Sequence, residues 1–129
     1  MIHRKVSAAS LLAASLTALL ALAARAEAHH SFAMFDKKSS TTVKGTVSKV
    51  EWKNPHAYLF VNVTAEGGAT RQYTIECSSP NELKRFGWKM TSVKVGDAVT
   101  AEIYPLRDGR PGGLLYALTL PNGVVLKAN

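Results

Sequence analysis

Three histidines of this chain stand where they could bind one transition metal together. His29 and His30 directly follow Ala26-Glu27-Ala28, an A-x-A pattern typical of export cleavage sites. Cleavage after Ala28 would leave His29 first, so that its α-amine and ring nitrogen could chelate one ion. His56 follows the turn-forming pair Asn54-Pro55. Because imidazole and amine nitrogens suit copper, zinc and nickel, the sequence predicts a metal site, copper first, made by His29, His56 and His30.

The segment before these histidines has the pattern of a signal peptide. Arg4 and Lys5 form a short basic region, and an Ala/Leu-rich run covers residues 6–24. We expect residues 1–28 to be cleaved and the product to be periplasmic or secreted, without a transmembrane segment. Retention of the leader as an anchor is one alternative. Cleavage after Ala26 is another, and it would leave a loose chelating tail that begins at Glu27.

Composition limits what the exported product can be. Cleavage after Ala28 leaves 101 residues, which is the size of one small domain. Those residues hold 13 lysines and arginines against 8 acidic residues, a net charge of +5. The basic residues are scattered, with pairs only at 37–38 and 84–85. This pattern predicts a solvated surface and no nucleic-acid partner.

Cys77 is the only cysteine, so the chain cannot form an intramolecular disulfide. Two interpretations remain open for it. It is a small apolar residue of a buried strand face, or it is a reactive thiol or a soft metal ligand.

Hydrophobic periodicity predicts a mostly β domain. Strands are expected at 43–52, 57–64, 70–77, 99–103 and 114–120, after which Asn122-Gly123 turns the chain back into residues 124–126. The apolar phase changes between Val47 and Val50, which indicates a bulge in the first strand. Ser79-Pro80-Asn81-Glu82 predicts a capped helix start, with Leu83 and Phe86 on the inner face and Gly87 at the end.

Three strands, a short helix and two further strands match the order of a five-stranded oligonucleotide/oligosaccharide-binding (OB) barrel. We therefore predict an OB-like β-barrel over residues 43–129, preceded by a docked N-terminal segment at 29–42. A small β-sandwich is the alternative, because strand order alone does not establish closure.

In such a barrel, two loops flank the ligand face, here residues 52–56 and 106–113. They place aromatic and basic side chains at the rim, and these suit sugars or extended acidic chains. The predicted ligand-binding residues are Trp52, Lys53, Tyr58, Arg107 and Arg110. Their expected partner is an anionic glycan, a peptide or a protein of the cell envelope.

No nucleophile elbow, phosphate-binding glycine loop or HExxH motif is present, so we do not predict an enzyme, although copper redox chemistry stays open. Three functions remain: a copper-binding module, an accessory barrel for an anionic ligand, and a structural envelope protein without a small ligand. Sequencing the first residue of the exported protein would test the copper function against the other two, because the copper site requires His29 to come first.

Several motifs together resemble a family of small exported bacterial proteins, domain of unknown function 6152. The resemblance lies in His-His-Ser-Phe-Ala-Met-Phe-Asp at 29–36, Gly-Thr-Val at 45–47, Trp-Lys-Asn-Pro-His at 52–56, Gly-Trp at 87–88 and Val-Gly-Asp at 95–97. It covers essentially the whole chain after the leader. It implies export and a single domain, and it carries no activity over to this chain.

Overall fold

The structure is a computed structural model, and it describes residues 32–128. Residues from Phe35 onward form one compact unit. Six strands and one short helix follow one another along the chain. They are β1 (Thr41–Glu51), β2 (Tyr58–Thr64), β3 (Thr70–Glu76), α2 (Pro80–Arg85), β4 (Ala98–Pro105), β5 (Gly112–Thr119) and β6 (Val125–Lys127).

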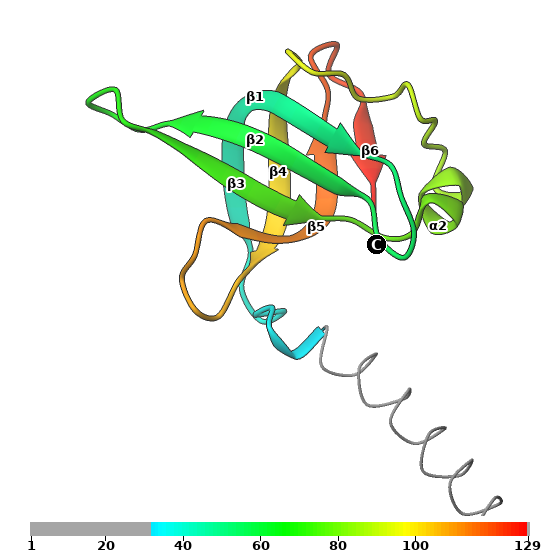
Figure 1. Ribbon diagram of the computed structural model, residues 1–129, viewed down its shortest axis with the longest axis horizontal. Coiled ribbons are helices and arrows are strands. Elements are labelled where there is room, and N and C mark those ends of the chain that lie inside the picture. Colours follow the sequence, from blue (N-terminus) through cyan, green and yellow to red (C-terminus); the bar gives the residue numbers. More distant parts are fainter. Residues whose placement is uncertain (1–31, 129) are drawn as a thin grey trace, which may run out of the picture. The chain divides into compact units, whose positions relative to one another are not determined.

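The strands close into a barrel. The sheet runs in the order β3-β2-β1-β4-β5-β6, and a parallel pairing of β3 with β5 joins its two sides. That pairing is short, from Thr74 opposite Gly112 to Glu76 opposite Leu114. β2 and β3 extend beyond the barrel as a long hairpin, whereas α2 lies at the opposite end (Figure 1). The order, the closure and the helix after β3 confirm the predicted OB-like barrel over the predicted sandwich.

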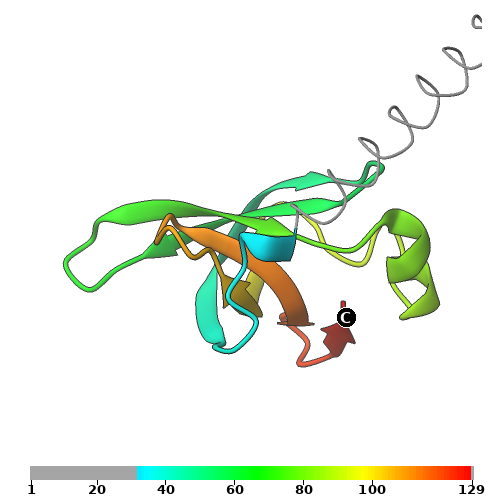
Figure 2. The ribbon, with the colours of Figure 1, turned by 90° about the horizontal axis from the view of Figure 1, so that it is seen from below.

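The first strand bends where its apolar phase changes. The register of β1 against β2 shifts between Val47 and Lys49, so Ser48 is an extra residue on β1. This bulge confirms the irregularity expected between Val47 and Val50. It lets one strand pair with β4 at its start and with β2 at its end, which is how β1 turns around the barrel (Figure 2).

Two glycines of β5 allow the backbone to approach its neighbours closely. A Cβ atom at Gly112 would overlap the carbonyl oxygen of Thr74 on β3, and one at Gly113 would overlap the carbonyl oxygen of Tyr104 on β4. Gly112 and Gly113 lie where β5 meets both strands at the barrel closure. Closure at this point therefore requires residues without side chains.

Alternating residues of the strands fill the interior, as their periodicity predicts. The fully buried large side chains include Val61, Ile75, Ile103, Leu115 and Leu118. Because the core draws on β2, β3, β4 and β5 at once, it stabilises the closed barrel as one unit.

The helix begins as predicted and ends before Gly87 as predicted, but the side chain of Phe86 lies differently. The Ser79 hydroxyl accepts from the backbone N–H of Glu82, whose side chain contacts the Ser79 N–H, which completes a capping box. Leu83 is buried, but Phe86 is 46% exposed, so its expected place on the inner face is wrong. Phe86 is the C-cap of a helix of only six residues, and Trp88, just beyond it, occupies the core. Within residues 32–128, no helix is long and apolar enough to span a bilayer.

Candidate functional site

His56 lies at the rim of the barrel and is held by a carboxylate. Its Nδ1 is 2.8 Å from Oε1 of Glu76, and the two side chains are 28% and 12% exposed. The other carboxylate oxygen, Oε2, accepts a hydrogen bond of 3.3 Å from the Tyr58 hydroxyl. Burial and the Glu76 charge raise the pKa of Tyr58, so its hydroxyl stays a donor. One carboxylate thus orients a histidine and a tyrosine.

Strand pairing explains why these residues meet although they are far apart in sequence. Tyr58 and Glu76 face each other in the β2–β3 register. Just beyond that pair, Cys77 donates its backbone N–H to Ala57, and Ala57 donates to Ser78. These bonds hold the end of the β1–β2 loop against the end of β3, so the residue before Ala57 is placed beside Glu76.

The contact favours one arrangement of the proton on the His56 ring. A carboxylate beside Nδ1 favours the proton on that nitrogen, which leaves the lone pair of a neutral ring on Nε2. Within the part of the chain that the structure describes, Nε2 of His56 has no hydrogen-bonding partner. His56 can therefore offer Nε2 to a metal ion or to a polar ligand.

The other two predicted metal ligands, His29 and His30, lie outside the described residues. Among residues 32–128, no group of three or more histidine, cysteine, aspartate or glutamate side chains is arranged to hold a metal ion. His56 with Glu76 is thus at most part of a metal site.

The chain shortly after His29 and His30 is anchored to the barrel. Phe35 is 3% exposed and forms a β-bridge with Leu106, directly after β4. The next residue, Asp36, donates its backbone N–H to the carbonyl of Pro105 at 2.8 Å. By contrast, Phe32 and Met34 are 49% and 41% exposed. Phe35 and Asp36 thus place the start of the described chain in contact with the barrel strands and their loops.

A short series of backbone contacts connects this anchor to the end of β3. Leu106, the bridge partner of Phe35, donates its backbone N–H to Gly112 at 3.3 Å. Gly112 in turn pairs with Thr74, two residues before Glu76. The anchor at Phe35 and the carboxylate that holds His56 are therefore connected by backbone contacts at the barrel closure.

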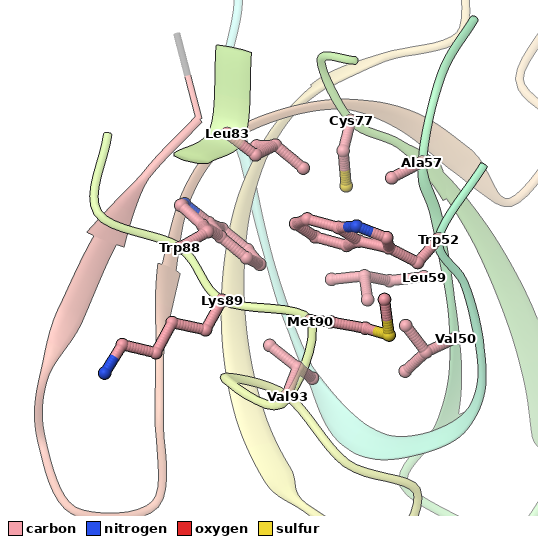
Figure 3. A pocket seen from close by; sticks show the side chains of 10 residues that line it. All are labelled: Val50, Trp52, Ala57, Leu59, Cys77, Leu83, Trp88, Lys89, Met90 and Val93. Carbon is pink, nitrogen blue, oxygen red and sulfur yellow. The ribbon is translucent and has the colours of Figure 1, made fainter. Parts of the chain in front are cut away.

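Trp52, predicted to bind a ligand at the rim, lines an apolar pocket (Figure 3). Leu83 and Trp88 line the same pocket, Met90 lies at its exposed side, and the pocket holds only about 10 Å³ of free space. That is room for about one water molecule. Trp52 is thus partly buried and packs against the core at the end of the barrel.

Lys53 and Tyr58, two more predicted ligand residues, do lie together. The Lys53 Nζ is 5.7 Å from the centroid of the Tyr58 ring. The same arrangement recurs next to it, where the Lys49 Nζ is 5.1 Å from the centroid of Phe60. Lys49 and Phe60 are not among the predicted ligand residues, although the alternation of β2, with Leu59 buried, already turns Phe60 outward.

The two predicted arginines stand on the β4–β5 loop and are engaged with acidic residues. The Arg110 Nε donates to Asp108 at 2.7 Å. Arg107 is 3.9 Å from the Asp36 carboxylate. Hydrogen bonds from Ser39 and from the Lys38 backbone lower the pKa of Asp36, and bonds from Arg110 lower that of Asp108. Both carboxylates therefore favour the ionised form, which pairs with the arginines.

Cys77 is 2% exposed, and burial raises the pKa of its thiol. The sulfur donates weakly to the carbonyl of Ile75 at 3.9 Å. A protonated, enclosed thiol is neither a ready nucleophile nor a ready metal ligand. The structure therefore favours the packing interpretation of Cys77.

Comparisons with known proteins agree with this description. The sequence model of a family described as "Family of unknown function (DUF6152)" matches residues 16–116. No curated protein matches the chain. Among solved structures, the chain is similar to the mitochondrial single-stranded DNA binding protein Rim1 from S. cerevisiae, with a TM-score of 0.50 and 13% identity over 64% of this chain and 93% of that one. At this identity the likeness supports the barrel fold alone.

Proposed function

Since the chain belongs to this family, DUF6152, which brings no activity with it, we propose from the site that it is a small exported module that binds one Cu(II) ion. The proposed ligands are the amine and ring of His29, exposed by cleavage after Ala28, and Nε2 of His56. His30 is a fourth ligand or an outer partner. The observation that carries the proposal is the contact of His56 Nδ1 with Glu76, 2.8 Å away.

That contact is the arrangement expected of a metal-binding histidine. Such residues commonly direct their second ring nitrogen at a carboxylate, which orients the ring and raises the basicity of the ligating nitrogen. Glu76 would have this positioning role, and the Tyr58 hydroxyl would hold the other carboxylate oxygen. Among the described residues, His56 lacks further ligands of its own kind close by, so the remaining donors must come from the N-terminal segment.

The length of that segment sets a requirement for the proposal. His29 precedes the anchored Phe35 by six residues, which reach roughly 20 Å when extended. The contacts from Phe35 to Glu76 cross between neighbouring chain segments three times, at about 5 Å each, and follow two residues of β3 for about 7 Å. This route is about 22 Å long, comparable to the reach of the segment, so the proposal requires residues 29–34 to run extended and more directly toward His56 than the route does.

The chemistry of the donors selects the metal. One amine and two or three imidazole nitrogens favour Cu(II), which binds nitrogen ligands more tightly than the other divalent ions of the first transition row and accepts a planar arrangement. Protons compete for the same nitrogens, so binding should weaken as the solution is acidified.

The test is a copper titration of the exported protein, followed by electron paramagnetic resonance, after its N-terminal residue has been sequenced. We expect one Cu(II) per chain with a nitrogen-rich signal. One residue added before His29, or the change His56→Ala, should abolish that signal. Glu76→Gln should weaken binding about 10- to 100-fold. Glu102→Gln, an exposed residue of β4, is the matched control.

Three results would contradict the proposal. A first residue other than His29 would remove the amine from the ring chelate. A copper signal unaffected by His56→Ala would reduce the site to an adventitious chelate of the N-terminal tail. Equal copper affinity of the Glu76→Gln and Glu102→Gln variants would show that the carboxylate does not position the ligand.

A further inference from the structure

The outer face of β1, β2 and β3 carries two aromatic rings, each covered by a lysine. Lys49 lies over Phe60 and Lys53 over Tyr58. We call these four residues with Glu51 the lysine–aromatic face. Phenylalanine on an outward strand position has no role in the core, because the next residues on either side, Leu59 and Val61, already fill the interior.

The spacing of the two rings suits an extended chain ligand. Tyr58 and Phe60 are two residues apart on β2, so their rings repeat at about 7 Å along the strand. The Lys49 and Lys53 side chains are each 59% exposed, and their ammonium groups are held by solvent-accessible ion pairs with Glu51. Exposed cation–π contacts are weak, so an incoming ligand can displace the lysines and take their place on the rings.

The charges of the face are balanced between signs. Glu51 lies between the lysines, with its oxygens 2.6 Å from the Lys49 Nζ and 2.5 Å from the Lys53 Nζ. Hydrogen bonds from the two ammonium groups lower the pKa of Glu51 to about 2. With Glu76 beside Tyr58, two cations and two carboxylates share the face.

Amide and hydroxyl groups continue the face toward the β2–β3 hairpin. The Gln72 side-chain amide donates to the Ser48 hydroxyl at 3.1 Å and to the Asn62 side-chain oxygen at 3.4 Å. Thr74, opposite Phe60 in the register, is exposed. Such groups pair with ligand hydroxyls through exchangeable hydrogen bonds.

We propose that the lysine–aromatic face binds an extended acidic oligosaccharide, that is, a chain of uronate sugars. Sugar rings would lie on Tyr58 and Phe60, and the displaced Lys49 and Lys53 would pair with the uronate carboxylates. Glu51 would accept hydrogen bonds from sugar hydroxyls. This inference goes beyond the copper proposal and does not depend on it.

Hydrogen-bonding groups favour this ligand over a single-stranded nucleic acid, the other polymer that stacks on aromatic residues. A nucleic acid presents a phosphate at every nucleotide and is bound by predominantly positive grooves. Here it would meet the carboxylates of Glu51 and Glu76. A uronate chain also carries one negative charge on every sugar, but each sugar adds several hydroxyls, which can donate to the carboxylates and pair with the amide and hydroxyl groups of the face.

The experiment titrates metal-free exported protein with a hexamer of galacturonate, using calorimetry and amide NMR shifts. We expect shifts confined to β1, β2 and β3. Phe60→Leu, which keeps the apolar volume but removes the ring, should weaken binding at least tenfold, and so should the double change Lys49→Ala with Lys53→Ala. Lys84→Ala with Lys127→Ala removes two exposed lysines elsewhere and should change the affinity less than twofold. Thermal melts monitor folding of every variant.

Each other outcome would overturn the proposal. Absence of binding at millimolar hexamer, or equal loss in the Lys49/Lys53 and Lys84/Lys127 variants, would remove the face as a specific site. Tighter binding of a thymidine oligomer than of the uronate hexamer would assign the face to nucleic acid. Equal binding of an uncharged glucose hexamer would leave the lysines without a role. Because no metal is present, these results are independent of the copper test.

Discussion

We predict that Trp88 makes a large contribution to the free energy of unfolding. Its indole is 3% exposed, and its Nε1 donates a 2.7 Å hydrogen bond to the carbonyl of Lys127 on β6. The ring joins the segment after α2 to the last strand and lines the same pocket as Trp52. We therefore expect Trp88→Ala to loosen the end of the barrel that carries the β1–β2 loop.

The size of the effect follows from the packing. The neighbours leave only about 10 Å³ of free space, so they are already in contact and loss of the ring creates a new cavity. Truncation of a buried tryptophan under these conditions costs about 3–5 kcal/mol. Trp88→Phe keeps most of the apolar contact but loses the hydrogen bond to Lys127 and some volume, which together cost about 2 kcal/mol.

Urea unfolding followed by circular dichroism measures both values, with Phe86→Ala as the matched control. Phe86 is two residues away and 46% exposed, so its truncation should change the free energy of unfolding by about 0.5 kcal/mol or less. A loss of less than about 1 kcal/mol for Trp88→Ala, or equal losses for Trp88→Phe and Trp88→Ala, would show that the indole does not hold this end of the barrel together.

Two further predictions concern the barrel closure and the lysine–aromatic face. Gly113→Ala should lower the free energy of unfolding by about 1–3 kcal/mol, because the added Cβ overlaps the Tyr104 carbonyl oxygen; an unchanged urea midpoint would show that β4 and β5 can separate without cost. The carboxyl of Glu51 should titrate near pH 2 by NMR, and Lys49→Ala should move its pKa upward toward 4.5. Since the folded pKa is the lower one, the stability that Glu51 contributes is complete above pH 4.5 and is lost as the pH falls through about 2. Titration near 4.5 in the unaltered protein would contradict the lysine contacts.

Features that depend on neighbouring residues could be predicted from the sequence. The capping box at Ser79 and Glu82 forms within four residues, so its side chains and backbone groups meet whatever the rest of the chain does. Strand periodicity likewise accounts for the burial of Val61 and Ile75, and the phase change located a bulge between Val47 and Val50. These local signals gave the order of the strands and the helix, and that order predicted the barrel.

Features that depend on distant neighbours could not be predicted in this way. Phe86 and Trp88 are both large apolar residues beside a helix end, and only the packing of β6 over that end decides that Trp88 is buried and Phe86 exposed. The sequence placed Arg107 and Arg110 at the rim, but the structure directs them at Asp36 and Asp108.

The candidate site divides in the same way. The sequence by itself determined that His56 follows a turn at the end of the first strand, because Asn54-Pro55 is a local turn signal. That its Nδ1 meets Glu76, and that Lys49 lies over Phe60, depends on the pairing of β1 with β2 and of β2 with β3. A shift of one residue in either register would turn these side chains to the other face of the sheet, so only the closed tertiary structure decides which residues the site contains.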